Sequence, residues 1–327
     1  MKIDLRQLPK ARMDFVKPML ATPVKELPSG ANWLYELKLD GYRVLAMKER
    51  SGVTLFSRRG NNLSNTYPTI AAAFSFLPRE TMLDGELVVL DETGKPSFAA
   101  LQKHRFTPSA LYFYVFDLIT FQGRDLRRLP LLERRSLLER QVLKEMCEPI
   151  RLSSIFDTDA RRLVAAAKKS GLEGVVAKRR DSRYESGERS AAWVKYKTNK
   201  GQELVVGGYK PGPNGFEYLL VGYYEGKSLI FIAKIRNGFT PALRRDVAQH
   251  FAGLRTAVCP FANLPEKASA RRGEAITADV MKGIQWLKPK LVAHIEFTEW
   301  TKGNHLRHSK FVAIRDDKEA AEVTKEF

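Results

Sequence analysis

Cysteine, histidine and long apolar runs are scarce in this sequence of 327 residues, and each scarcity excludes a class of protein. The two cysteines, Cys147 and Cys259, lie far apart without partners at metal-ligand spacing, so we expect two reduced, buried thiols rather than a disulfide framework or a zinc site. No apolar run approaches the roughly 20 residues that cross a bilayer. The first residues also lack the apolar core of a secretory signal. We therefore expect a protein of the cytoplasm.

Two further signatures are missing. The five histidines form no ligand set, and we expect His305 and His308, three residues apart in a polar stretch, to lie on a solvated face. The pattern GxxxxGK[ST] does not occur, so a bound nucleotide would not be cradled by a P-loop.

Acidic residues are also few when set against the basic ones. There are 37 Asp and Glu against 55 Lys and Arg, which gives a net charge of +18. Phosphates attract such a surplus over long distances whatever the fold, so the charge favours a polyanionic partner. The alternative is a basic surface that serves only solubility.

The first 199 residues alternate irregularly between strand and helix patterns, which predicts an α+β domain. Residues 1–30 carry several prolines and are interpreted as an irregular lead-in. Branched apolar runs predict strands, and Pro130 and Asp159 are suited to the first turn and the N-cap of helices. We expect strands at 32–58 (three, with two turns), 81–90, 111–120, 174–177 and 192–194, and helices at 66–77, from Pro130, and from Asp159 to about Ser170.

The pattern changes after a polar joint, Lys-Thr-Asn-Lys-Gly, at 197–201. Beyond it we expect short strands at 203–209, 218–224, 228–236 and 291–300, and one helix at about 241–254. The last strand alternates, with Leu291, Ala293, Ile295 and Phe297 on one face. A small barrel with one helix fits this pattern, and the OB-fold is the commonest such barrel in nucleic-acid enzymes. The sequence thus predicts a boundary between residues 199 and 200.

The stretch Glu36-Leu37-Lys38-Leu39-Asp40-Gly41-Tyr42-Arg43 is the first candidate for chemistry. Lys38 lies at a turn between two strand-like apolar segments, where it can be held away from bulk water. Desolvation or nearby cations lower the pKa of an ammonium group, and a deprotonated lysine is a nucleophile. The alternative is an ordinary lysine at the edge of a hairpin.

Five more stretches combine charge with a strand-like setting. They are Ser57-Arg58-Arg59-Gly60, Leu83-Asp84-Gly85-Glu86, Glu173-Gly174-Val175-Val176-Ala177-Lys178, Trp193-Val194-Lys195-Tyr196-Lys197 and Arg315-Asp316-Asp317-Lys318. Acids are depleted in strands, so each needs a reason such as a metal, a ribose hydroxyl or an arginine partner. Lys195 and Lys197 share a face by alternation. Each stretch alone also fits a turn or a charged strand edge.

Together the stretches supply a nucleophilic amine, several cations for a triphosphate and two glutamates for a hard divalent ion. Phosphoryl and nucleotidyl transfer need this combination, because their catalysis is mostly positioning and charge neutralisation. The sequence therefore favours an enzyme that transfers a nucleotidyl group.

The order of these stretches resembles the covalent nucleotidyltransferase superfamily, and within it an ATP-dependent DNA ligase. Lys38-Leu39-Asp40-Gly41-Tyr42-Arg43 matches KxDGxR, the other stretches follow in family order with Phe116-Asp117 among them, and Arg315-Asp316-Asp317-Lys318 matches RxDK. The resemblance spans about residues 17–320. Its compact length is similar to the ligase modules of bacterial end-joining enzymes and their stand-alone relatives. It implies a nucleotidyltransferase (adenylation) domain at 1–199, with antiparallel sheets and flanking helices, followed by an OB-fold domain at 200–327.

The resemblance also implies a role for each matched residue. Lys38 would attack the α-phosphate of ATP to give lysyl-AMP and pyrophosphate, the adenylate would pass to the 5′-phosphate of a nick, and the 3′-hydroxyl would seal it. The other matches would contact the adenine (Glu36, Phe116), the ribose and phosphate (Arg43, Arg58), a ribose hydroxyl or Mg²⁺ or Mn²⁺ (Glu86, Glu173), the nucleotide phosphates (Lys178, Lys195, Lys197) and, from the barrel when the domains close, the pyrophosphate (Arg315, Lys318).

Some assignments stay open at this level. Ser57-Arg58-Arg59-Gly60 departs from the commoner Arg-Asn-Gly pattern, and we choose Arg58 over Arg59. Asp40 either orders its turn or acts in the later steps. An RNA ligase, an mRNA-capping guanylyltransferase and a non-enzymatic DNA-binding barrel are the alternative functions. The expected setting is a monomer that repairs nicked duplex DNA at the nucleoid of a bacterial cytoplasm, with a Ku or repair-polymerase partnership left open.

Overall fold

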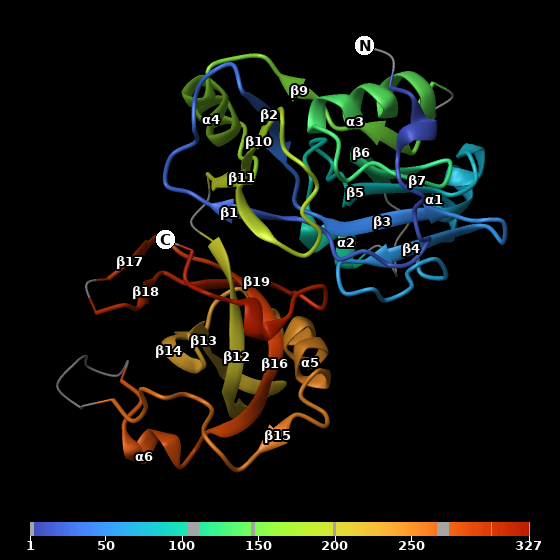
Figure 1. The fold of residues 1–327 in the computed structure, drawn as a ribbon. Coiled ribbons are helices and arrows are strands. Elements are labelled where there is room, and N and C mark those ends of the chain that lie inside the picture. The colour runs from blue at the N-terminus through green and yellow to red at the C-terminus, as the bar shows by residue number, and fades with distance from the viewer. Residues whose placement is uncertain are drawn as a thin grey trace. The chain divides into compact units, whose positions relative to one another are not determined.

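Strands form most of the regular structure in both parts of the chain. The computed structural model describes residues 3–103, 111–144, 148–198, 201–266, 275–301 and 303–326. Two compact units, Met1–Asn199 and Lys200–Phe327, appear in Figure 1 in blue to yellow-green and in yellow to red. No helix of the described ranges is long and apolar enough to cross a membrane.

The first unit contains eleven strands and four α-helices in its described residues. The strands are β1 (Leu20–Pro23), β2 (Trp33–Lys38), β3 (Tyr42–Lys48), β4 (Val53–Ser57), β5 (Thr81–Val89), β6 (Leu111–Phe121), β7 (Arg124–Asp125), β8 (Ile150–Leu152), β9 (Ile155–Phe156), β10 (Gly174–Arg179) and β11 (Arg189–Lys197). The helices are α1 (Pro68–Ala73), α2 (Phe98–Lys103), α3 (Leu131–Leu137), which continues as a π-helical turn at Leu138–Val142, and α4 (Ala160–Lys169); short 3-10 turns lie at Leu5–Gln7 and Phe74–Phe76.

These strands form two mostly antiparallel sheets. One has the order β1-β11-β10-β2-β9, and the other has the order β4-β3-β5-β6-β7 with β8 beside β6. Two pairs are parallel, β1 with β11 and β6 with β8. The prediction that residues 1–30 are irregular is wrong at β1. Prolines at 18 and 23 suggested a loop, but a proline is tolerated at the end of an edge strand, where β1 has Pro23.

The two sheets pack face to face through one apolar cluster. Leu34 and Trp193 come from the first sheet, and Leu45, Met82 and Phe116 come from the second. The opposite face of the first sheet is covered by α4, whose apolar stripe packs on β10 and β11 (Figure 1). Alternation along the first sheet therefore divides its side chains between the helix and the space between the sheets.

Two helices that the sequence of this unit predicts, from Pro130 and from Asp159, are confirmed. The Asp159 carboxylate accepts hydrogen bonds from the backbone N–H groups of Arg161 and Arg162, as an N-cap does. Gly171 has φ +67°, the left-handed conformation that ends many helices. The helix predicted after Pro130 is also confirmed, and its residues Leu131, Leu138 and Val142 are buried.

The second unit is a curled sheet with one full helix, in keeping with an OB-fold. Its elements are β12 (Gly201–Gly212), β13 (Gly215–Glu225), β14 (Ser228–Ile235), α5 (Pro241–Gln249), β15 (Arg255–Thr256), α6 (Ala278–Met281), β16 (Gln285–Glu296), β17 (Glu299–Trp300), β18 (Leu306–Arg307) and β19 (Lys310–Ile314), with a 3-10 turn at Ala320–Glu322. The sheet has the order β14-β13-β12-β16-β15, and β19 pairs with β16. A bridge between Asn237 and Lys310 returns β19 to the end of β14, so the strands close on themselves.

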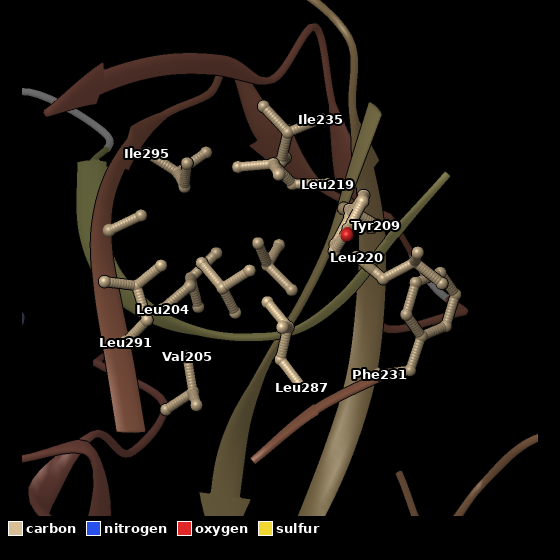
Figure 2. Close-up of a cluster of buried hydrophobic side chains, with 14 of the residues drawn as sticks. Leu204, Val205, Tyr209, Leu219, Leu220, Phe231, Ile235, Leu287, Leu291 and Ile295 are labelled. Atoms are coloured by element: carbon tan, nitrogen blue, oxygen red, sulfur yellow. The ribbon is translucent and has the colours of Figure 1, made fainter. Parts of the chain in front are cut away.

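The inside of this curled sheet is filled by aliphatic and aromatic side chains. Leu204, Leu219, Ile235 and Ile295 are all fully buried there, and they point toward one another in Figure 2. Alternating side chains on long strands produce this core, because one face of each strand turns inward. The core holds the strands that carry the terminal charged motif.

Three predictions for the second unit need correction. The strand expected at 291–300 is β16, which begins at Gln285 and ends at Glu296. It begins earlier than expected because Pro289 lies within the strand and does not interrupt it. The helix expected to reach residue 254 ends at Gln249. His305 is not solvated: its Nδ1 lies 2.6 Å from the Ile232 carbonyl oxygen and its Nε2 lies 3.1 Å from Glu266 Oε1.

The remaining histidine and cysteine predictions have mixed outcomes. His308 is exposed, as expected. Cys259 is a free thiol but only half-buried, and burial raises the pKa of this thiol. Cys147 lies outside the described residues.

Candidate active site

Three neighbouring strands of the first sheet place several charged side chains on one face. Lys38 of β2 pairs across with Gly174 of β10, which pairs in turn with Lys197 of β11. Two residues further along each strand, Glu36 is level with Val176 and Lys195. After two more residues, Leu34 is level with Lys178 and Trp193. The prediction that Lys195 and Lys197 share a face is confirmed, and Lys38, Glu36 and Lys178 share that face with them.

Lys38 is held by a carboxylate. Its Nζ lies 2.5 Å from Glu173 Oε1, and the two side chains are 20% and 15% exposed. Burial by itself lowers the pKa of Lys38, but attraction by Glu173, aided by Glu86, outweighs both burial and the repulsion by Lys197. The pKa of Lys38 is therefore raised, and the expectation of a lowered pKa is wrong. The expectation considered burial and cations, whereas the fold sets two glutamates beside the amine.

Glycines allow the strands of this site to approach closely. A Cβ atom on Gly174 would lie 2.0 Å from the Tyr196 carbonyl oxygen of β11. A Cβ atom on Gly41, in the turn after Lys38, would lie 2.2 Å from the Leu87 carbonyl oxygen of β5. Real Cβ atoms do not come this close to other heavy atoms, so neither position accepts a side chain without movement of the backbone.

Glu36 is buried within a set of donors. Its Oε1 accepts from Lys178 Nζ at 2.9 Å and from Arg135 at 3.2 Å, and its Oε2 accepts from the Ser153 hydroxyl at 2.9 Å. Burial lowers the pKa of Lys178 despite the attraction of Glu36 and Asp117. A carboxylate offers about four acceptor positions, so Glu36 can still accept one more hydrogen bond. Its contact with adenine remains a prediction.

Cations lie on the ring of Phe116. Lys178 Nζ is 4.2 Å and Arg43 Cζ is 4.4 Å from the ring centroid, and Trp193 meets the ring edge to face. Both distances are within the range of cation–π attraction. Lys178 thus lies beside Phe116 and Glu36, level with Leu34, rather than level with Lys38. Its contact with nucleotide phosphates is a prediction that these positions do not test.

Arg43 is fixed by a carboxylate from the neighbouring sheet strand. Its Nε and Nη2 donate to Asp84 at 2.5 and 2.6 Å, and the Tyr184 hydroxyl donates to the same carboxylate at 2.5 Å. Burial and then the Asp84 charge raise the pKa of Tyr184 well above its ordinary value, so the hydroxyl stays a donor. Asp84 therefore has the arginine partner that a strand acid needs.

Sequence reasoning missed Arg135 and Tyr184 as members of this site. A signal for the first was present, because Arg135 falls on the apolar stripe of α3 between Leu131 and Leu138, where a charged residue needs a buried partner. No local pattern identified Tyr184, because its partner Asp84 lies 100 residues away in the chain.

Two predicted residues lie in turns. In the turn after β4, the Ser57 hydroxyl accepts from the backbone N–H groups of Arg59 and Asn61 at 3.3 and 3.1 Å, and Arg58 is half-buried whereas Arg59 is exposed. This burial supports the choice of Arg58. Asp40 Oδ2 accepts from the backbone N–H of Phe98 at 3.3 Å, so Asp40 ties its turn to the start of α2.

Glu86 and Glu173 fit a hard divalent ion with few protein ligands. Glu173 lies 2.5 Å from Lys38 Nζ, and the charge of Glu86 also raises the pKa of Lys38. In the part of the chain that the structure describes, no three His, Cys, Asp or Glu side chains gather as a metal site. Mg²⁺ commonly uses one or two carboxylates together with waters and substrate phosphates, so this pair is a sufficient donor set.

The terminal motif on the second unit forms its own ion cluster. Arg315 Nε and Nη2 donate to Asp317 at 2.8 and 2.9 Å, and both side chains are buried. Glu203 of β12 lies 3.9 Å from Arg315 and 4.0 Å from Lys318. Burial by itself raises the pKa of Asp317, but Arg315 outweighs it and the pKa is lowered. The Arg315 side chain is thus held by neighbouring carboxylates within its own unit.

A lysine amine set among glutamates and lysines on one sheet face is what an enzyme of nucleotidyl transfer requires. Two family models confirm this class. The ATP dependent DNA ligase domain matches residues 18–197, and the ATP dependent DNA ligase C terminal region matches residues 212–318. The chain belongs to the ATP-dependent DNA ligase family.

Individual relatives agree with the family assignment. The multifunctional non-homologous end joining protein LigD of Pseudomonas aeruginosa is 36% identical over 96% of this chain and 37% of its own length. The multifunctional non-homologous end joining DNA repair protein LigD of Mycobacterium tuberculosis is 35% identical over 96% of this chain and 40% of its own. A mycobacterial DNA ligase D complexed with ATP and MES has a TM-score of 0.64 at 34% identity, covering 95% of this chain and 98% of that one. The chain thus spans about two fifths of these curated relatives.

Proposed function

We propose that this chain is an ATP-dependent DNA ligase that seals nicks between 3′-hydroxyl and 5′-phosphate ends. The observation that carries the proposal is the Lys38 amine, 2.5 Å from Glu173 on a sheet face that also bears Glu36, Lys178, Lys195 and Lys197. This arrangement gives one nucleophile, cations for phosphates and carboxylates for a divalent ion. Family membership supports the same activity.

In the first step Lys38 Nζ attacks the α-phosphate of ATP. A phosphorus–nitrogen bond forms, the bond to the bridging oxygen breaks, and that electron pair leaves on pyrophosphate. The ammonium must first lose a proton, and Glu173 is the group that faces it. Glu86 and Glu173 would hold Mg²⁺ or Mn²⁺, which neutralises phosphate charge when bound. The AMP would then pass to the 5′-phosphate, and attack by the 3′-hydroxyl would release it.

The other predicted residues take positions that suit binding. We place the adenine at Phe116 and Glu36, the end of the face where Lys178 also lies. Arg43 and Arg58 would hold the ribose and phosphate. Lys195 and Lys197 would contact the phosphates, because Lys197 lies in the same cross-strand row as Lys38.

The wider setting is part of the proposal. We assign residues 1–199 as the adenylation domain and 200–327 as an OB-fold domain for nicked duplex DNA. The bacterial relatives are named for non-homologous end joining, so we propose end-joining repair as the pathway, with Ku or a repair polymerase as a partner. We further propose a monomer that acts in the bacterial cytoplasm, at the nucleoid.

The test is transfer of label from ATP. The protein is incubated with ATP labelled at the α-phosphate and a divalent metal, and the products are separated on a denaturing gel. We expect label on the protein, and then on AMP when a nicked duplex is added, with a sealed strand as product. A protein that labels with GTP, or that joins single-stranded RNA but not nicked DNA, would instead be a capping enzyme or an RNA ligase.

The terminal motif should act in one step. Pyrophosphate is the leaving group only in the step that adenylates Lys38. Arg315→Ala should therefore slow self-adenylation by roughly 100-fold, the scale for removal of one donor from a transition state. Sealing of a nick that already carries AMP should change much less. Single-turnover rates of both steps check this. Arg307→Ala, which removes an exposed arginine of the same unit, is the control, and equal losses in the two steps would contradict the assignment.

A further inference from the structure

A row of side chains crosses four strands of the second sheet of the first unit. Arg43 of β3 pairs with Glu86 of β5, Glu86 pairs with Tyr114 of β6, and Tyr114 pairs with Arg151 of β8. Arg43 and Glu86 belong to the candidate site. The row therefore continues from that site to two residues, Tyr114 and Arg151, that have no role in it so far.

Arg151 is stacked on tyrosines. Its Cζ lies 3.8 Å from the ring centroid of Tyr112 and 5.8 Å from that of Tyr114, and its Nη1 donates to the Tyr114 hydroxyl at 3.0 Å. The guanidinium also faces Glu148, with its Nη2 2.8 Å from Oε1. The side chains of Arg151 and Glu148 are 35% and 62% exposed. A partly exposed arginine is thus held in one orientation by two aromatic rings.

The stacked arginine lies on the same side of the sheet as the active site. Tyr112, Tyr114 and Phe116 alternate along β6 and so share a face. Two residues after Arg151, Ser153 donates its hydroxyl to Glu36. On an extended chain, residues two apart point the same way. Arg151 is therefore turned toward the side on which Glu36 lies.

We propose that Arg151, oriented by Tyr112 and Tyr114, binds a backbone phosphate of the DNA strand next to the nick. This inference rests on the proposed ligase function and extends it to a DNA contact. The planar guanidinium suits a phosphate, which it can bind through two parallel hydrogen bonds. Stacking reduces the loss of side-chain freedom on binding. An exposed ion pair such as that of Arg151 with Glu148 contributes little free energy. A phosphate can therefore replace Glu148 as the partner of Arg151 when DNA binds.

The test uses variants of Arg151 and Glu148 that should change the affinity for DNA in opposite directions. Arg151→Gln removes the phosphate contact, and Glu148→Gln removes the competing carboxylate. Tyr112→Leu keeps the arginine but removes a stacking ring. Arg179→Gln is the matched control, since Arg179 also pairs with an exposed acid, Asp181, but alternates onto the other face of β10 from Lys178.

The probe is a nicked duplex that carries AMP on its 5′-phosphate and lacks the 3′-hydroxyl, so that it binds without being sealed. Affinity is measured by fluorescence anisotropy over a series of potassium chloride concentrations. For Arg151→Gln we expect a loss of affinity of roughly fivefold and a salt slope smaller by about 0.9, the value for one phosphate. Glu148→Gln should bind more tightly than wild type, and Tyr112→Leu more weakly. Arg179→Gln should behave as wild type.

Two results would overturn the proposal. One is an Arg151→Gln protein whose affinity and salt slope match those of wild type. The other is a Glu148→Gln protein that binds more weakly, since Glu148 would then support the DNA contact rather than compete with it. Labelling of each variant by ATP shows whether its site is intact. A wild-type protein that takes no label refutes the ligase function itself, whereas an Arg151→Gln protein that takes label and binds DNA as wild type does refutes the phosphate contact alone.

Discussion

Lys38→Ala should abolish transfer of AMP to the protein and, with it, sealing of unadenylated nicks. Removal of the attacking nucleophile from an enzyme costs on the order of 10⁴-fold or more in rate. The measurement is the labelled band on a denaturing gel together with sealing of a nicked duplex. Sealing of a nick that already carries AMP should survive, because Lys38 is not a reactant in that step.

Lys38→Arg is the control for charge. It keeps a cation beside Glu173, but the guanidinium remains protonated at all accessible pH values and cannot attack phosphorus. We expect a protein that melts like wild type and takes no label. Lys48→Ala, at the far end of β3, should label normally. Label that remains on the Lys38→Ala protein would place the nucleophile elsewhere.

The elements of the first unit were largely predictable from the sequence, because its long strands and its α-helices bury their own apolar stripes. The three strands after residue 32 and the helix capped by Asp159 were found in this way. Short edge strands were not predicted. β1 and β8 have four and three residues, and each is defined by a parallel partner, β11 or β6, that is distant in sequence. A local pattern carries no information on such pairing.

The membership of the candidate site was also largely predictable, but its electrostatics were not. Spacing showed that Lys195 and Lys197 share a face, and the register of β10 explains why Lys38 is level with Lys197. The direction of the Lys38 pKa shift depends on the distances from Lys38 to Glu173 and Glu86. These two residues come from different sheets, since Glu173 precedes β10 and Glu86 lies on β5. Tyr184, which completes the site by a contact with the distant Asp84, was missed for the same reason.

The largest expected effect on stability comes from the acid next to Phe116. Asp117 accepts two hydrogen bonds from Arg134 at 2.8 Å, and both side chains are fully buried. Asp117→Ala leaves an uncompensated guanidinium in the interior, which typically costs about 3–5 kcal/mol. For a unit of this size such a loss lowers the melting temperature by roughly 10 °C. Thermal denaturation followed by circular dichroism measures it.

A second substitution separates the charge from the packing. When both partners of a buried ion pair are replaced by apolar residues of similar volume, stability often returns. We therefore expect Asp117→Ala with Arg134→Met to melt above the single variant, although the contacts of Arg134 with the Leu129 and Ser182 carbonyl oxygens are lost as well. Asp181→Ala, which breaks an exposed pair with Arg179, should melt as wild type does. An Asp117→Ala protein as stable as that control would show that the buried pair contributes nothing to folding.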